Sequence, residues 1–322
     1  MWRFKPIYKS KIWGGDRILK FKGWQSDNDK IGESWELSGV PGDESVICSP
    51  RDYGMTITEL IGKYGADLMG EKNFERFGTK FPLLIKFIDA GDDLSIQVHP
   101  DDEYSEANGL GSGKNEMWYV LDADRDSRLL NGFRNPQDRK SFLKSLNSGE
   151  IREILRQLEV TPGDAYYIPA GRVHSIGKGT FLLEVQQASD STFRIYDYNR
   201  TGEDGKQRQL NISEALDVIN FDDTKGDRLR YMTIEHVPSV IIDTPFFTSK
   251  VLMLSDQMLR NYSEVDSFVA LVCVGGKAIL ETRNHTMDIN RGETVLLSAL
   301  EKEVHITPSG EEEFIAVEVF IR

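Results

Sequence analysis

A short apolar run at residues 94–100 carries an amide and an imidazole two positions apart. It reads Leu-Ser-Ile-Gln-Val-His-Pro, so only Val98 separates Gln97 from His99. Alternate residues of a β-strand project from the same face, and a strand here would point both polar side chains, with Ser95 beside them, into the same space. An amide oxygen and an imidazole nitrogen placed in this way can supply two ligands to a metal ion.

Two further segments offer the remaining ligands of such a site. Glu116 lies in Lys-Asn-Glu-Met-Trp at residues 114–118, and His174 closes a segment that reads Pro-Gly-Asp, four residues, Pro, four residues, His. Any one of these residues alone could be an ordinary polar residue at a strand end. Together, two imidazoles, a carboxylate and an amide oxygen form a mixed set that suits zinc or a neighbouring divalent ion and leaves room for water or substrate.

These motifs resemble those of a known superfamily. The segment ending at His174 matches the second motif of the cupins, and Gln97-Val98-His99 stands where cupins usually carry His-x-His. The fuller resemblance is to the type I mannose-6-phosphate isomerases, or phosphomannose isomerases, of the short bacterial and archaeal form. It covers most of the chain and rests on residues 13–15, 32–35, 94–100, 114–118, 162–174, 184–194 and 196–198.

The resemblance implies a zinc-dependent aldose–ketose isomerase that interconverts mannose 6-phosphate and fructose 6-phosphate through an enediol. It assigns one zinc ion per chain to Gln97, His99, Glu116 and His174. It makes Arg194 the catalytic arginine and places Glu33, Lys114 and Glu184 in the pocket. The general base stays open between Glu184 and a metal-bound water.

The substrate contacts are less narrowly defined. Ser95, Lys114 and Arg194 are candidates for the phosphate, the lysine as a point charge and the arginine as a fork. Trp13 could stack on the sugar or pack in the core. Two other functions also stay open: a cupin that binds a phosphosugar without turnover, and another cupin metalloenzyme such as an iron oxygenase. The retained cations disfavour the first, and the amide at Gln97 disfavours the second.

The composition limits the partners of the chain. Its 322 residues include 39 basic and 52 acidic side chains, a formal charge of −13, which argues against a nucleic-acid partner. No apolar run approaches the length of a membrane span and no secretory signal begins the chain, so we expect a cytoplasmic protein that binds no membrane. Cys48 and Cys273 lack the spacing of a disulfide or thiolate metal site.

We expect a mainly β fold, a cupin-type jelly-roll sandwich or barrel with helical insertions and a second, degenerate cupin-like β domain. Residues 275–277 and 291–297 echo the segment 162–169, as if the cupin unit occurred twice, but without ligands. The polar stretch 221–228 is the best boundary. It predicts a metal-binding catalytic domain at residues 1–225 and a C-terminal β-sandwich domain at residues 226–322.

The periodicity also predicts individual elements. Apolar residues at helical spacing predict one helix over residues 57–68, and a hairpin turn at 91–93 is expected to join a strand at 83–88 to the metal-bearing strand. Residues 101–113 are expected to be a surface loop. A helical insertion is expected to begin at Asn135-Pro136 and to continue over 151–158, and Asn211 should cap a short helix.

Overall fold

The structure is a computed structural model that describes residues 1–24, 30–202 and 205–322. Its strands form four sheets, and every strand pairing is antiparallel. Among the described residues, no helix combines the length and the apolar character needed to cross a membrane. The mainly β architecture agrees with the sequence-based expectation.

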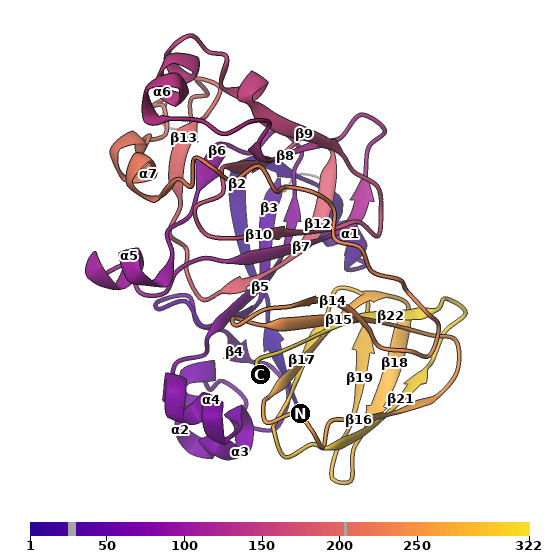
Figure 1. Ribbon diagram of the computed structural model, residues 1–322. Helices are drawn as coiled ribbons and strands as arrows, with labels where there is room; N and C mark the ends of the chain where they lie inside the picture. Colours follow the sequence, from indigo (N-terminus) through magenta and orange to yellow (C-terminus); the bar gives the residue numbers. More distant parts are fainter. Residues whose placement is uncertain (25–29, 203–204) are drawn as a thin grey trace.

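Two sheets make up the part of the molecule that carries the predicted ligands (Figure 1). The six-stranded sheet has the order β10 (Ala165–Ile168), β7 (Glu116–Ala123), β12 (Thr180–Gln187), β5 (Leu83–Asp89), β3 (Ile31–Ser38) and β2 (Ile7–Gly15). The five-stranded sheet has the order β13 (Phe193–Tyr196), β6 (Ile96–Val98), β11 (His174–Ile176), β8 (Arg128–Phe133) and β9 (Leu155–Glu159). An apolar cluster that includes Leu182, Leu129 and Ile176 joins the two sheets.

The remaining strands form the second pair of sheets. One has the order β14 (Ser239–Asp243), β15 (Thr248–Leu254), β22 (Phe314–Phe320), β17 (Val269–Gly275), β20 (Thr294–Leu297), β1 (Trp2–Lys5) and β4 (Val46–Ile47). The other has the order β16 (Met258–Asn261), β21 (Glu303–Pro308), β18 (Lys277–Glu281) and β19 (Thr286–Asn290). Strands β1 and β4 thus reach across the predicted boundary at residue 225 and complete a sheet of C-terminal strands.

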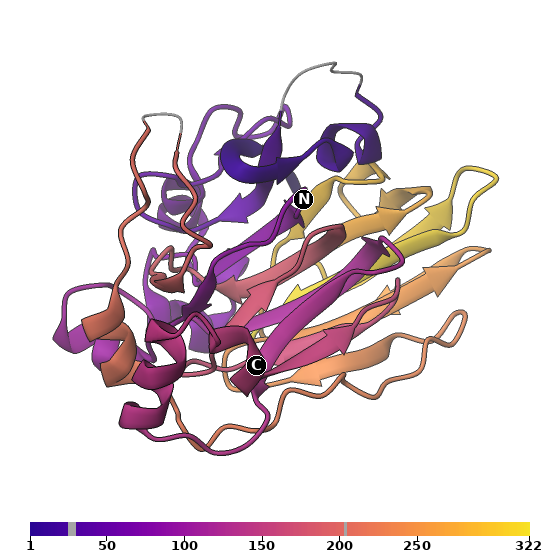
Figure 2. The same cartoon turned by 90° about the horizontal axis from the view of Figure 1, so that it is seen from above.

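The sheets are stacked in four layers, and the place of a sheet in this stack determines whether one or both of its faces are buried. The largest core cluster contains Leu183 and Phe87 of the six-stranded sheet and Val272 and Val317 of the seven-stranded sheet. Both inner sheets are therefore covered on two faces, and strand β12 is buried at every position. The outer four-stranded sheet alternates instead, as in β18, because one of its faces meets solvent. Figure 2 shows the C-terminal strands beside the strands of the first half.

The helices correct several sequence-based expectations. The helix predicted over residues 57–68 is two helices, α2 (Ile57–Tyr64) and α3 (Ala66–Met69), because Gly65 turns the backbone to a φ of 52°. Helices α1 (Arg17–Phe21) and α4 (Glu71–Phe77) were not predicted. The expected loop 101–113 contains α5 (Asp102–Ala107), whose first turn is capped by Asp101. The prediction of a plain loop there is wrong.

The later helical predictions are also partly wrong. Helix α6 (Arg139–Asn147) begins behind an Asp138 capping box and not at Asn135-Pro136. Residues 151–158 form a 3₁₀ turn, η1 (Ile151–Ile154), and then strand β9. Helix α7 (Ile212–Val218) is confirmed, but Asn211 makes no side-chain cap. The turn 91–93 is not a hairpin, because β5 and β6 belong to different sheets.

Candidate metal centre and active site

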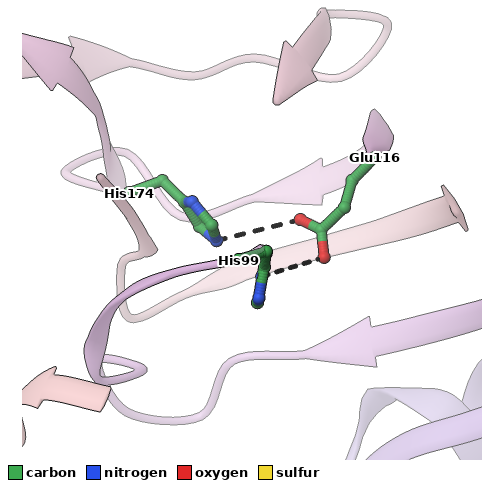
Figure 3. A group of neighbouring side chains, drawn as sticks. All are labelled: His99, Glu116 and His174. Carbon is green, nitrogen blue, oxygen red and sulfur yellow. Dashed lines mark ion pairs between the residues drawn. The ribbon is translucent and has the colours of Figure 1, made fainter. Parts of the chain in front are cut away.

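Three predicted ligands meet in the space between the first two sheets (Figure 3). His99 follows β6, Glu116 opens β7 and His174 opens β11, and all three side chains are buried. His99 Nε2 lies 3.1 Å from Glu116 Oε1, and His174 Nε2 lies 3.8 Å from Glu116 Oε2. One donor atom from each residue falls within 4.8 Å of the others, so this group could hold a metal ion.

Backbone contacts fix the protonation of the two imidazoles. His99 Nδ1 lies 3.0 Å from the Ser191 carbonyl oxygen, and His174 Nδ1 lies 2.9 Å from that of Arg172. A carbonyl oxygen can only accept, so Nδ1 carries the proton and Nε2 keeps its lone pair. This is the usual arrangement of a metal-ligating histidine, whose second nitrogen is held by a neighbouring acceptor.

The charges of the group also suit a cation. Burial, with His99 beside it, lowers the pKa of His174 to about 3, and burial lowers the pKa of His99 with help from Lys114. Burial alone would raise the pKa of Glu116, but Lys114 and His99 outweigh it and hold that pKa well below its usual range. The group therefore offers two neutral imidazoles and one carboxylate.

Glu116 itself is left with unsatisfied oxygens. Neither carboxylate oxygen makes a well-aligned hydrogen bond, although Lys114 Nζ forms an ion pair 3.0 Å from Oε1. A buried carboxylate without such bonds is costly. A divalent cation between Glu116, His99 and His174 would remove that cost, so these residues fit a metal ion.

Gln97 lies at the edge of the same group. It is the cross-strand neighbour of both His174 on β11 and Arg194 on β13. Its Nε2 lies 3.3 Å from His174 Nε2, and its Oε1 accepts a hydrogen bond from Ser95 Oγ at 3.3 Å. Turning the amide would exchange the two atoms and bring Oε1 beside the imidazole nitrogens, since the two orientations have nearly the same shape. Gln97 is thus within reach as a fourth ligand.

A second buried charge group crosses the six-stranded sheet next to the metal centre. Glu184 on β12 lies opposite Lys86 on β5 and opposite Trp118 on β7. Lys86 Nζ lies 3.0 Å from Glu184 Oε1, and Trp118 Nε1 donates to Oε2 at 2.7 Å. Burial raises the pKa of Glu184, the nearby Glu116 raises it further, and Lys86 opposes both. A raised pKa makes the ionised carboxylate a stronger base than an ordinary glutamate, which suits proton transfer.

Glu33 is held in a similar way from β3. Its Oε2 accepts a hydrogen bond from Trp35 Nε1 at 2.7 Å, and Lys11 Nζ lies 3.6 Å from Oε1. Burial would raise its pKa, but Lys86 and Lys11 lower it. The pKa of Glu33 is therefore shifted in the opposite direction to that of Glu184.

These residues surround one cavity of about 220 Å³. It is lined by Lys11, Trp13, Glu33, Lys86, Ile88, Leu94, Ser95, Gln97, Lys114, Ile176, Glu184, Asp190, Thr192, Arg194 and Arg208. Every predicted catalytic and substrate-binding residue is in this lining, which adjoins the ligand group. A larger hollow of about 510 Å³ lies between α1 and the C-terminal sheets and contains none of them, so size alone does not identify the site.

Five of the lining polar residues were missed in the sequence: Lys11, Lys86, Asp190, Thr192 and Arg208. Lys86 could have been found, because it is the single charge inside the buried apolar run 83–88 and therefore needs a buried partner. Arg208 had no such signal, since it lies in an irregular polar segment.

Arginines concentrate positive charge at the rim of the cavity. Arg194 donates to the Gln209 carbonyl oxygen at 2.9 Å, while its Nε is buried without a hydrogen bond. Arg208 and Arg200 both pair with Asp197, with Arg208 Nε 2.7 Å from Oδ2 and Arg200 Nη2 2.6 Å from Oδ1. Arg194 and Arg208 line the cavity, whereas Arg200 lies outside its lining and also pairs with Asp92 at 3.5 Å.

Comparison with known proteins agrees with the motifs. A family model described as "Phosphomannose isomerase type I, catalytic domain" matches residues 1–127, and one described as "Mannose-6-phosphate isomerase, cupin domain" matches residues 239–319. Mannose-6-phosphate isomerase ManA of Bacillus subtilis is 32% identical over 297 residues, which cover 91% of each chain. The chain belongs to the type I mannose-6-phosphate isomerases.

Further relatives support the same family. The mannose-6-phosphate isomerase of Streptococcus mutans is 34% identical over 239 residues, or 74% of each chain. The crystal structure of the Bacillus subtilis mannose 6-phosphate isomerase superposes with a TM-score of 0.86 at 26% identity and covers 99% of this chain and 98% of that one. The predicted family and fold class are thereby confirmed, whereas the domain boundary at residue 225 stays a prediction.

Proposed function

We propose that the chain interconverts mannose 6-phosphate and fructose 6-phosphate, with one zinc ion held by Gln97, His99, Glu116 and His174. The observation that carries the proposal is that the buried ligand group adjoins, through Gln97 and Lys114, a cavity that is lined by Glu184 and by several cations. A bound divalent cation would supply Lewis-acid polarisation of the substrate oxygens. The neutral imidazoles and the unsatisfied oxygens of Glu116 suit that ion.

Glu184 is the general base in this proposal. Its carboxylate removes the proton from C2 of the open-chain aldose, the electron pair forms the C1=C2 bond, and the carbonyl oxygen at C1 gains a proton to complete the enediol. Glu184 then returns its proton to C1, and the hydroxyl at C2 releases a proton that balances the one taken up by the C1 oxygen, which leaves the ketone at C2. Its raised pKa suits both directions of the transfer.

The cations bind and orient the substrate. Arg194 lies directly beside Gln97 across β6 and β13, so its guanidinium can donate to the oxygen that becomes negative as the enediol forms. Arg208, at the same rim, adds positive charge for the phosphate, which the overall negative charge of the chain would otherwise repel. Ser95, Lys114, Glu33 and Trp13 complete the substrate-facing lining.

A coupled isomerase assay on the chelated and the zinc-reconstituted protein tests the proposal. We expect activity to fall below about 1% after chelation and to return with one zinc per chain. Full activity in protein shown by elemental analysis to be metal-free would contradict it. Tight binding of mannose 6-phosphate by zinc-loaded protein without any product would identify a binding cupin instead.

A further inference from the structure

The indole of Trp118 contacts two parts of the site at once. Trp118 is fully buried in β7, two residues beyond Glu116. Its Nε1 donates a hydrogen bond of 2.7 Å to Glu184 Oε2. Its ring packs edge-on against the imidazole of His174, with the ring centroids 5.4 Å apart and the planes at 74°. One side chain therefore touches both the base of the proposed reaction and a proposed metal ligand.

Sheet register explains why the contact with Glu184 is specific. Trp118 and Glu184 are directly opposite each other on β7 and β12, and Lys86 is opposite Glu184 on the other side. The indole holds one carboxylate oxygen, and Lys86 lies near the other. An indole has one donor at a fixed place on a rigid ring, whereas a lysine ammonium ends a flexible four-carbon stem. The indole therefore sets how the carboxylate plane is turned.

That orientation bears directly on proton transfer. The last torsion of a glutamate is broad, so a carboxylate without a fixed partner samples many orientations. Glu184 Oε1 makes no well-aligned hydrogen bond and lies 3.0 Å from Lys86 Nζ, so the indole is the directional partner of this carboxylate. A misplacement of the order of 1 Å between reacting groups can cost about 100-fold in rate.

We propose that Trp118 is a positioning residue of the isomerisation: its N–H holds the carboxylate of Glu184 in the orientation needed for proton transfer, and its ring braces His174. This inference rests on the proposed function, because it takes Glu184 as the base. It goes beyond that function by assigning the orientation of the base to an uncharged side chain that does not line the cavity.

The test replaces the indole N–H and little else. Trp118→Phe keeps an aromatic ring against His174 but removes the donor, and β-(3-benzothienyl)alanine at position 118 keeps the full bicyclic shape with sulfur in place of N–H. The matched control is Trp2→Phe, because Trp2 is equally buried and donates to a carboxylate, Asp52 Oδ2, at 2.9 Å in a part of the chain outside the cavity lining.

For both position-118 variants we expect bound zinc near one per chain, a KM for mannose 6-phosphate within about twofold of wild type, and a kcat per bound zinc lower by about 10- to 100-fold. The kinetic isotope effect on kcat with substrate deuterated at C2 should be at least as large as in the wild type, because proton abstraction is the step that slows. Trp2→Phe should keep kcat.

Three results would overturn the inference: a normal kcat per zinc in the benzothienyl variant, an isotope effect that falls towards unity, or an equal loss in Trp2→Phe. Glu184→Gln separates this failure from a failure of the proposed function. If Glu184→Gln keeps normal turnover, the base assignment is wrong. If Glu184→Gln is inactive while both position-118 variants are normal, only the role of Trp118 is wrong.

Discussion

His174 and Arg194 differ in what their side chains can contact, and this difference separates metal binding from chemistry. His174 presents an unprotonated Nε2 to the other proposed ligands, so His174→Ala should lower zinc per chain and activity together. Arg194 cannot ligate a cation, so Arg194→Met should keep its zinc and lose about 100- to 1000-fold in kcat. Elemental analysis and steady-state kinetics on both variants measure this.

Two outcomes would contradict these roles. A zinc-loaded Arg194→Met enzyme with near-normal kcat and a raised KM would make Arg194 only an anchor for the phosphate. A His174→Ala variant that keeps both its fold and its zinc would remove His174 from the ligand set.

Asp89 lies on the face of β5 that points away from the cavity, and its buried carboxyl group should make the stability of the fold depend on pH. Burial raises its pKa to about 6, although its carboxylate accepts the backbone N–H of Arg17 at 2.6 Å. The folded state therefore holds this proton up to about pH 6, while the unfolded chain releases it near pH 4, so the ionised form costs stability as pH rises through that window. Above the window the cost is constant.

Asp89→Asn should remove this cost. We expect the free energy of unfolding at about pH 7.5 to rise by up to about 3 kcal/mol, with little gain at about pH 3.5, because the wild-type carboxyl is then mostly protonated in both states. Urea denaturation of both proteins at the two pH values is the measurement. An equal change at both pH values would show that the charge of Asp89 is not the cause.

The side-chain cap at the start of helix α2 allows a prediction about stability. Thr56 Oγ1 accepts the backbone N–H of Glu59, and the Glu59 carboxylate accepts that of Thr56, which closes a capping box at the start of α2. Thr56→Ala should lower the free energy of unfolding by about 1 kcal/mol and leave kcat unchanged, since α2 lies outside the cavity lining. Thermal unfolding followed by circular dichroism, together with the isomerase assay, checks both parts.

Strand parity was the most reliable guide from sequence to site. Gln97 lies in β6 with His99 directly after it, and Lys114 lies two residues before β7 opens at Glu116, so each pair is brought together at a strand end. Helix starts were less predictable. Asn135-Pro136 carries a standard start signal, but Asp138 forms the capping box, and such choices depend on how the segment packs.

Residues brought in by irregular segments could not be predicted. Asp190, Thr192 and Arg208 reach the cavity from connections whose path depends on the packed sheets around them. Their sequence has no period that would place them. The partner of β1 could not be predicted either, because nothing in its short sequence indicates that it pairs with β20, nearly 300 residues later.

At the scale of the molecule, that pairing tests the predicted domain boundary. Trp2 and Phe4 of β1 lie in the same core cluster as Val272 and Val317, so residues 226–322 alone would expose the edge of β20 and part of this core. We expect a fragment of residues 226–322 to show no cooperative thermal transition, whereas the full chain unfolds cooperatively. A sharp transition in the isolated fragment would mean that the boundary marks an independent folding unit.

The four-layer order also predicts where the chain tolerates change. Sheets covered on both faces offer no position in β12 or β17 where a new side chain meets only water. The outer sheet does, because Lys277, Ile279 and Glu281 alternate with buried partners and point outward. Substitutions, affinity tags and fluorescent labels on that outer surface should therefore leave the stability of the fold unchanged. In the six-stranded sheet, by contrast, a buried residue should change only together with the residues of the seven-stranded sheet that pack against it.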